Sequence, residues 1–262
     1  MVKYSIIIPT HNRPNLLVRA INSIKNQSGH NNIEIIIVSD VVDIKTDLLC
    51  SKLLEKNDIY IRRSGKPGPA ESRNLALKVC TGDAVIFLDD DDELAPNCIE
   101  SIEKYRKDNV PFLYFNAEIV LESRFQDGVV EHEKNILNLE NNLNKFIYAK
   151  NQIPICNIVF PVNIIKNIYF ESCMKAYEDW DYLLSVFDKT KPSFAPFTGS
   201  IIHQVNDNTS DRRGSSEDAI GNHAILDYLF VYKKHPVSDE EIKIARNNLI
   251  SICGINIGAE YL

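Results

Sequence analysis

Five consecutive acidic residues, Asp89 to Glu93, form the stretch of this sequence best suited to chemistry. They follow the apolar run Ala84 to Leu88, which has the length and residue types of a strand buried on both faces. Adjacent carboxylates repel one another, and the ligand crevices of open α/β sheets form at the carboxyl ends of strands. The cluster therefore predicts a site for Mg²⁺ or Mn²⁺ that is shared with substrate phosphates. The alternative is a solvated acidic loop that caps the following helix.

The elements that must position this cluster alternate in type along the N-terminal half. Apolar runs of strand type are expected at 4–9, 33–38, 59–61 and 84–88, and helical segments at 14–24, 43–56 and 70–79. This alternation predicts a mostly parallel central sheet with helices on both faces. Neither G-x-G-x-x-G nor a P-loop occurs, so the sequence gives no support to a dinucleotide-binding fold or an ATPase.

The second half has a less regular pattern. A helix is expected at 96–107, strands at 111–115 and 118–121, and an irregular, Asn-rich stretch at 125–143. The apolar stretch 153–170 is expected to pack against the site, followed by a helix from Tyr177 and two short strands within 193–203. A mobile polar loop at 206–218 and helices at about 219–234 and 239–253 complete the pattern.

Composition restricts the class of protein. The 262 residues carry a net charge of −7, and 44% of them are hydrophobic, which is typical of a globular protein and argues against binding to nucleic acid. The sequence has no signal-peptide pattern and no apolar run of membrane-spanning length. Its six cysteines are scattered without a C-x-x-C pair, as expected of reduced thiols. We therefore expect a cytoplasmic protein.

Several short motifs follow one another in order along residues 4–190. They are Ser5–Arg13, Val38–Asp40, Gly68–Asn74, Phe87–Asp92, Tyr169–Glu171 and Glu178–Asp181. In this order they resemble the inverting family 2 glycosyltransferases of the GT-A fold, of the kind that builds bacterial O-antigen or capsule polysaccharide. The run of aspartates is similar to the D-x-D motif of that family.

The resemblance implies an α/β GT-A fold, with a Rossmann-like, mostly parallel central sheet, helices on both faces and a C-terminal helical extension. It implies a catalytic domain at 1–205, in which 1–95 is the nucleotide-binding half and 96–205 the acceptor-binding half. The mobile loop and the C-terminal helices would occupy 206–262.

For the donor, the resemblance implies a cation, Mn²⁺ or Mg²⁺, that offsets charge on a diphosphate leaving group. The metal ligands that it implies are Asp91, Asp89 and His203. The nucleotide-binding residues that it implies are Pro9, Thr10, Asn12, Asp40, Arg73, Asp89 and Asp90. Among these, Asp40 would accept a hydrogen bond from uracil, and the planar fork of Arg73 would bind uracil or phosphate oxygens. Simpler roles stay open, namely a helix cap for Asp40, a surface charge for Arg73 and a structural role for His203.

For the acceptor, the resemblance implies Asp179 as the general base of a direct displacement, with Glu178 orienting it or touching the acceptor. The start of a helix would keep Asp179 ionised. The simpler interpretation is a capping pair on an ordinary helix, and Trp180 fits core packing and stacking on a sugar ring equally well. In the polar loop, Arg212 and Arg213 either close over the diphosphate or are solvated charges.

These residues together imply transfer of a hexose or N-acetylhexosamine from a UDP-sugar to a hydroxyl of a glycan, typically a lipid-linked intermediate of surface polysaccharide at the inner face of the cell membrane. A peripheral membrane contact or a homodimer contact, through 153–170 or the terminal helices, is left open. The alternative is a catalytically inactive sugar-nucleotide-binding module. A haloacid-dehalogenase-like phosphatase is disfavoured because Glu93 stands where its motif needs threonine, and a sugar nucleotidyltransferase because Pro9–Asn12 supplies no glycine-rich loop.

Overall fold

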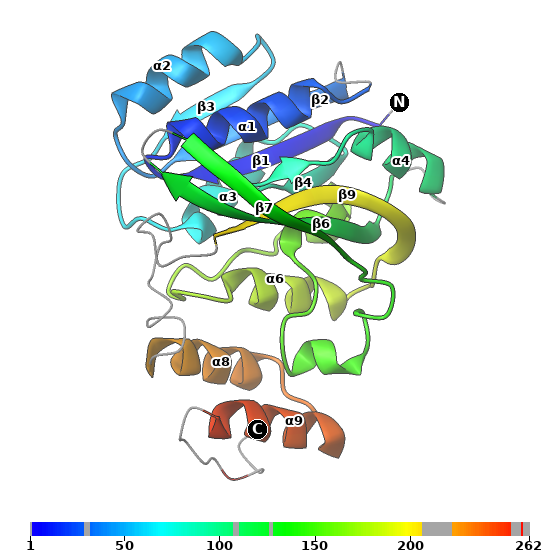
Figure 1. Ribbon diagram of the computed structural model, residues 1–262. Helices are drawn as coiled ribbons and strands as arrows, with labels where there is room; N and C mark the ends of the chain where they lie inside the picture. The colour runs from blue at the N-terminus through cyan, green and yellow to red at the C-terminus, as the bar shows by residue number, and fades with distance from the viewer. Residues whose placement is uncertain are drawn as a thin grey trace.

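The strands of the computed structural model form one sheet, in the order β3-β2-β1-β4-β8-β6-β9-β5, with β7 paired to β6. The structure describes residues 2–28, 32–106, 110–125, 128–205, 222–252 and 258. Figure 1 shows α1 and α4 on one side of this sheet and α6, α8 and α9 on the other. The predicted arrangement of a central sheet with helices on both faces is confirmed.

The N-terminal half is a set of parallel strands joined by helices, as predicted. Its strands are β1 (Tyr4–Thr10), β2 (Ile33–Ser39), β3 (Ile59–Arg62) and β4 (Ala84–Phe87), and its helices are α1 (Pro14–Lys25), α2 (Ile44–Leu53) and α3 (Pro69–Val79). Strand β1 pairs in parallel with both β2 and β4, so that Ile6 lies level with Ile35 and with Ile86. Because these strands are parallel, the loops that follow them meet at one edge of the sheet.

Alternate side chains of β1 enter two different parts of the core. Ile7 packs in a cluster with Ala76 of α3, whereas Ile6 and Ile8 pack in a second cluster with Leu17 of α1. Successive side chains of a strand point to opposite faces of the sheet. Because both faces of β1 are buried, its sequence is almost continuously apolar. The central strands β1, β2 and β4 are buried along their whole length.

The second half adds antiparallel neighbours to the same sheet. Here β8 (Ile158–Pro161) lies between β4 and β6 (Leu113–Phe125), and β9 (Ser193–Val205) lies between β6 and the short β5 (Glu93–Leu94). Strand β8 is antiparallel to both its neighbours, while β6 and β9 are parallel. The intervening helices are α4 (Cys98–Tyr105), η3 (Ile155–Asn157), α5 (Val162–Ile165) and α6 (Glu178–Phe187).

Three predictions for the second half are wrong. The two strands expected at 111–115 and 118–121 are the single strand β6, and those expected within 193–203 are the single strand β9. The stretch 125–143, expected to be irregular, contains strand β7 (Gly128–Leu137), which pairs antiparallel with β6. Nearly all of β7 is exposed. Cross-strand hydrogen bonding rather than burial therefore forms this strand, which is why its polar sequence carried no strand pattern.

The apolar stretch 153–170 is interior, as expected of a segment that packs against the site. Ile153, Ile158 and Phe160 are fully buried, and β8 occupies the middle of the sheet. Since these three side chains face the core, the membrane or dimer contact that the sequence left open for this stretch would have to use its exposed residues, such as Tyr169, and it stays a prediction.

The C-terminal helices α8 (Asn222–Lys234) and α9 (Glu240–Ser251) confirm the two helices expected there. Buried Arg246 of α9 donates hydrogen bonds to the carbonyl oxygens of Tyr148 and His235, which ties α9 to α8 and to the short helix η2 (Lys145–Tyr148). The polar loop expected at 206–218, including Arg212 and Arg213, lies outside the described residues. Within the described segments, every helix is too short or too polar to cross a membrane.

Candidate active site

The acidic run starts where β4 leaves the sheet. The backbone N–H of Leu88 donates to the carbonyl of Ile7, and the N–H of Asp92 then donates to the carbonyl of Asp89, closing a turn that holds the aspartates. The capping alternative is wrong, because Glu93 and Leu94 form β5 and helix α4 starts only at Cys98. The carboxylates are therefore held at the edge of the sheet by the strands on either side of them.

Asp90, a residue of this loop, is fully buried. Residues at and just after the end of β1 hold its carboxylate. Thr10 Oγ1 donates to Asp90 Oδ2 at 2.6 Å, and the guanidinium of Arg13 forms an ion pair with the same carboxylate. Burial raises the pKa of Asp90 to about 6, although the charge of Arg13 opposes this shift. Asp90 thus joins the two strand ends and is enclosed by protein.

Asp91 is more open, and two arginines compensate its charge. Its Oδ2 accepts a hydrogen bond from Arg13 at 3.1 Å and another, also at 3.1 Å, from Arg124 of β6. Arg124 in turn donates to Glu122 at 2.7 Å. None of Arg13, Glu122 and Arg124 was predicted to belong to the site. Arg13 ends the motif Ser5–Arg13, whereas no local pattern marks Glu122 or Arg124.

Asp40, at the end of β2, faces the same edge of the sheet. Its Oδ2 accepts a hydrogen bond from the backbone N–H of Gly68 at 2.7 Å, and its Oδ1 lies 2.5 Å from Nδ1 of His11. The helix-cap alternative is wrong, since the N-cap of α2 is Asp43. The carboxylate is nearly inaccessible to solvent. It links the loops that follow β1, β2 and β3.

The remaining residues predicted to bind nucleotide end β1. Pro9 and Thr10 are buried in that strand, level with Val38 and Ser39 of β2. Asn12 follows in the left-handed backbone conformation, with φ of 51°. These residues therefore lie on the same edge as Asp40 and Asp90.

Arg73 connects the acidic loop to helix α6. One amino group donates to Asp89 Oδ1 at 2.7 Å and the other to Glu178 Oε1 at 2.8 Å. The side chain of Arg73 is only 4% exposed and lies over the ring of Phe170, 5.3 Å from its centroid. The surface-charge alternative for Arg73 is therefore wrong. Burial would lower its pKa, but the charges of Asp89, Glu178 and Asp179 outweigh burial and raise it.

Asp179 stands beside Glu178 in the first turn of α6. Its Oδ2 accepts a hydrogen bond from the amide of Asn151 at 3.1 Å, and its Oδ1 accepts one from the backbone N–H of Trp180 at 2.8 Å. Desolvation of the carboxyl group, followed by the charge of Glu178, raises the pKa of Asp179 to about 7, although Arg73 opposes the shift. The start of α6 was expected to keep Asp179 ionised, but with a pKa of about 7 the carboxyl group is only partly ionised at neutral pH. No local pattern in the sequence marks Asn151 as a site residue.

Trp180 belongs to the core. It is fully buried, and its indole N–H donates to the carbonyl of Ile147 at 2.7 Å. Of the two roles left open for it, stacking on a sugar ring is excluded by this burial.

His203 lies in β9, below the acidic loop. Its Nδ1 is 2.9 Å from Glu122 and its Nε2 is 2.8 Å from Glu93, while its backbone N–H donates to buried Asp92 at 2.9 Å. Both ring nitrogens are thus engaged. Its role as a metal ligand stays a prediction, and it requires one of these glutamates to be displaced.

The oxygen donors of the acidic loop fit a divalent ion that is shared with a ligand. No group of three or more His, Cys, Asp or Glu side chains among the described residues is close enough to hold a metal. Asp89 and Asp91 nevertheless keep side-chain exposures of 42% and 22%. Mg²⁺ and Mn²⁺ commonly bind through one or two carboxylates plus substrate phosphates, so this donor set suits an ion that arrives with a diphosphate.

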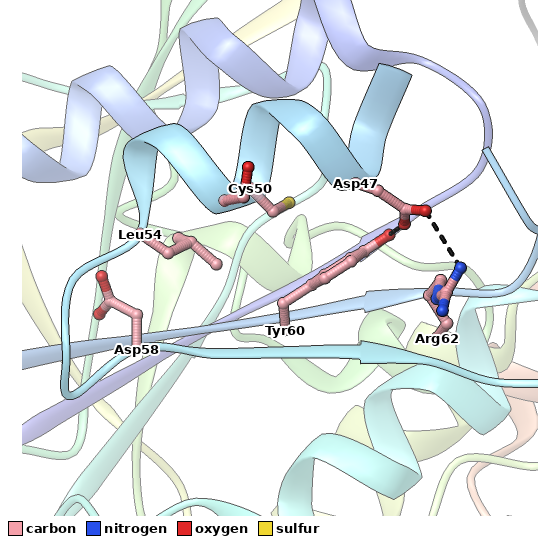
Figure 2. Close-up of a pocket in the computed structure, with 7 residues that line it drawn as sticks. Asp47, Cys50, Leu54, Asp58, Tyr60 and Arg62 are labelled. Atoms are coloured by element: carbon pink, nitrogen blue, oxygen red, sulfur yellow. Dashed lines mark hydrogen bonds and ion pairs between the residues drawn. The ribbon is translucent and has the colours of Figure 1, made fainter. Parts of the chain in front are cut away.

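A separate hollow of about 520 Å³ lies between α2 and β3. Figure 2 shows it lined by Asp47, Cys50, Tyr60 and Arg62, with Asp47 paired to Arg62. None of its lining residues belongs to the site described above. The chemistry-bearing residues therefore gather at the strand ends and not in this hollow.

Comparison with known proteins assigns the family. The model of the family described as glycosyl transferase family 2 matches residues 5–163, more than half of the chain. The chain belongs to glycosyl transferase family 2. The matched region contains the strand-end residues and Arg73, and the family assignment from the motifs is confirmed.

Two relatives indicate the range of the family. The GalNAc(5)-diNAcBac-PP-undecaprenol beta-1,3-glucosyltransferase of Campylobacter jejuni is 33% identical over 122 residues, which cover 45% of this chain and 39% of that protein. An uncharacterised glycosyltransferase of Haemophilus influenzae is 27% identical, and the match covers 98% of this chain and 82% of that protein. The chain therefore matches less than half the length of the Campylobacter relative.

Solved structures establish the GT-A fold for this family 2 chain. Staphylococcus aureus TarS in complex with UDP-GlcNAc superimposes with a TM-score of 0.60 at 16% identity, covering 95% of this chain and 71% of that one. A mannosyltransferase of Pyrobaculum calidifontis in complex with GDP-mannose and Mn²⁺ gives 0.62 at 13% identity, covering 97% and 73%. At these identities the likeness extends to the fold alone.

Proposed function

We propose that this protein is an inverting, metal-dependent glycosyltransferase that moves a hexose or N-acetylhexosamine from a UDP-sugar to a hydroxyl of a glycan acceptor. The observation that carries the proposal is the bridge through Arg73, which joins Asp89 of the acidic loop to Glu178, the neighbour of Asp179. Two acidic groups with different surroundings, the acidic loop and the Glu178–Asp179 pair, would thus share one site. Transfer with inversion needs this pair, one group for the leaving diphosphate and another for the incoming hydroxyl.

The donor would bind at the ends of β1, β2 and β4. Asp89 and Asp91 would hold Mn²⁺ or Mg²⁺, which supplies positive charge to a diphosphate as the glycosidic bond breaks. Asp40, whose carboxylate is held by Gly68 and His11 at the same edge of the sheet, would accept a hydrogen bond from the base. Arg13 and Arg124 already lie on Asp91, and their positive charge would favour an anionic ligand there.

Asp179 would accept the proton of the acceptor hydroxyl. A pKa of about 7 gives a base that is half ionised near neutral pH and strong enough to take a proton as the new bond forms. Asn151 fixes the orientation of the carboxylate through its amide, and Arg73 limits the rise in its pKa. Glu178, held by Arg73, would raise the basicity of Asp179 through its negative charge.

The acceptor class is proposed from the relatives. The Campylobacter protein acts, by its name, on an undecaprenol-linked glycan, and TarS is named as a poly(ribitol-phosphate) beta-N-acetylglucosaminyltransferase. A glycan on a lipid carrier, used in surface polysaccharide synthesis, is accordingly the acceptor that we propose.

A screen of UDP-sugars with Mn²⁺ tests the proposal through release of UDP, with GDP-mannose as the comparison donor. We expect release from at least one UDP-sugar, loss of release in EDTA and recovery with added Mn²⁺. In calorimetry, Asp91→Asn should weaken Mn²⁺-dependent binding of UDP. Release from GDP-mannose alone would refute the donor class, and binding of UDP without any turnover would favour the inactive binding module.

A further inference from the structure

The turn that leads into helix α6 is held in an unfavourable conformation. Tyr177, the residue before Glu178, has φ of 62°, in the left-handed region that a bulky side chain rarely adopts. Such a conformation persists only where surrounding structure enforces it, and it is concentrated at functional sites. Because Glu178 and Asp179 follow directly, the path of this turn decides where their carboxylates point.

Helix α8 supplies the contacts that enforce this turn. Asp227 Oδ2 accepts hydrogen bonds from the backbone N–H groups of Lys175 at 3.1 Å and Ala176 at 2.9 Å. The ring of Tyr228 lies 4.6 Å from the ring of Tyr177, centroid to centroid. Consecutive residues of α8 therefore hold the backbone before Tyr177 and the side chain of Tyr177 itself.

Lys234 at the end of this helix and His235 directly after it also anchor the body of α6. Lys234 Nζ lies 2.6 Å from Asp181 Oδ2, and His235 Nε2 lies 2.9 Å from Asp181 Oδ1. Asp181 is fully buried and is only two residues from Asp179, so α6 can neither rotate nor slide without breaking these contacts. In Figure 1, α8 lies directly beside α6 on the side away from the sheet.

Asn151, the hydrogen-bond partner of Asp179, also depends on contacts with α8. The hydroxyl of Tyr232 donates to the carbonyl of Ala149 at 2.8 Å, two residues before Asn151. Asn151 is the residue whose amide binds Asp179. Helix α8 therefore fixes both the carboxylate and the amide that orients it.

We propose that Asp227 and Tyr228 of α8 are positioning residues for Asp179, so that the C-terminal helices complete the acceptor side of the site. Helix α8 lies beyond the residues matched by the family model, which end at 163. The inference rests on the proposed role of Asp179 as the base, and it assigns a function to a part of the chain that the family match leaves without one.

Loosening the turn should change the pKa of Asp179, whereas general destabilisation of the fold should not. The charged groups that act on its carboxyl are Glu178 on α6, Arg73 on α3 and Asp89 in the acidic loop. Its pKa is raised mainly because water is excluded from the carboxyl group. If the turn relaxes, water reaches the carboxyl group and its pKa falls toward the usual range, whereas partial unfolding elsewhere would leave the pKa of the folded fraction unchanged.

The test compares three variants of the full chain. Asp227→Ala removes the acceptor of both N–H groups, while Asp227→Asn keeps an acceptor oxygen and serves as the rescue. Glu240→Ala removes an exposed acid of α9 that forms an ion pair with Lys243 at 2.8 Å, and it is the matched control. The pKa of Asp179 is followed by ¹³C NMR of its carboxyl carbon, assigned by the signal that Asp179→Asn removes.

We expect the Asp179 signal to titrate near pH 7 in the parent, in Asp227→Asn and in Glu240→Ala, and at least one pH unit lower in Asp227→Ala. With an active UDP-sugar, Asp227→Ala should also release UDP at least tenfold more slowly, with UDP–Mn²⁺ affinity within twofold of the parent. An unmoved titration in folded Asp227→Ala overturns the inference. Turnover at the parental rate in Asp179→Asn would instead refute the base assignment, whatever α8 does.

Discussion

Two regions of the site are held in place by different kinds of contact. The strand-end region, made of Thr10, Asp40 and Asp89 to Asp92, is fixed by backbone pairing of β1, β2 and β4. The α6 region, made of Glu178, Asp179 and Asn151, is fixed by side chains that arrive from α3 and α8 and from the segment around η2. Sheet hydrogen bonds are numerous and cooperative, whereas the α6 region depends on a few single contacts.

Buried carboxylates inside and outside the site titrate in opposite directions. At the start of β2, away from the site, burial alone would raise the pKa of Glu34, but hydrogen bonds from Lys3, Ser5 and Thr81 outweigh it and lower the pKa to about 2. In the site, burial prevails in both regions and raises the pKa of Asp90 to about 6 and that of Asp179 to about 7. The protein thus stabilises the buried charge of Glu34, while the site keeps carboxylates at a cost in stability, as expected of groups retained for chemistry.

The largest effect should follow from Asp179→Asn. We expect UDP release to fall by about 10²–10⁴-fold, the usual contribution of a general base, because the amide cannot accept the proton. Binding of UDP with Mn²⁺ should be unchanged in calorimetry, since the strand-end region is intact. Equal losses of binding and turnover would mean that the two regions do not have separate roles.

Arg73 belongs to both regions, so Arg73→Leu should weaken the fold as well as the site. We expect a loss of about 3 kcal/mol in the free energy of unfolding, at the low end of the range for removing one partner of a buried ion pair, because Asp89 keeps much of its exposure. Urea unfolding measures this loss. The control is Arg62→Leu, which breaks an exposed pair with Asp47 and should cost under about 1 kcal/mol.

The pH dependence of stability should have opposite signs for Asp179 in the site and for Glu34 outside it. Turnover should fall about tenfold per pH unit below pH 7 as Asp179 takes up a proton. The raised pKa means that folded Asp179 binds more protons than unfolded Asp179 between about pH 4 and 7, so its contribution to stability decreases as pH rises through that window. Asp179→Asn should therefore raise the unfolding temperature at pH 8.

The depressed pKa of Glu34 has the opposite effect. Its stabilising contribution is present above its unfolded pKa and is lost as the pH falls toward 2. Glu34→Gln should consequently unfold at a lower temperature than the parent at pH 8. At pH 3, the difference between the two unfolding temperatures should be smaller. A stabilising effect of Glu34→Gln at pH 8 would contradict the contrast between Glu34 and Asp179.

The smallest effect is expected from Asn151→Ala. Loss of one hydrogen bond to Asp179 is worth about 1 kcal/mol, which corresponds to roughly a fivefold to tenfold fall in turnover. UDP–Mn²⁺ binding should stay at the parental value. The control is Asn135→Ala on β7, whose amide pairs only with exposed Glu133 among the described contacts and whose removal should leave turnover unchanged.

The contrast between the regions also explains what the sequence could predict. The strand-end residues follow apolar runs directly, and parallel strands bring their ends together, so Asp40 and Asp89 to Asp91 could be assigned to one edge from the sequence alone. The contacts that surround them could not. Arg124 meets Asp91 from 33 residues away, and Asn151 meets Asp179 from 28 residues away. Such pairs depend on tertiary packing and leave no local pattern.

The same limit explains the errors in the second half. Strand β7 has almost no buried side chain, so its sequence lacks the alternation that reveals a half-buried strand. The ionisation of Asp179 was misjudged because the helix start was visible in the sequence while the desolvation caused by its neighbours was not. Trp180 likewise could be placed in the core only after α6 and η2 were seen to pack together.

The most direct test of the account is whether a metal bound at the strand-end region lies close to Asp179. Trp180 is the one tryptophan of the chain and adjoins Asp179, so its indole N–H gives a single, assignable NMR signal. With UDP, Mn²⁺ should broaden this signal relative to Mg²⁺, and Asp91→Asn should abolish the broadening. A signal that stays sharp in protein saturated with UDP and Mn²⁺ would contradict a shared site.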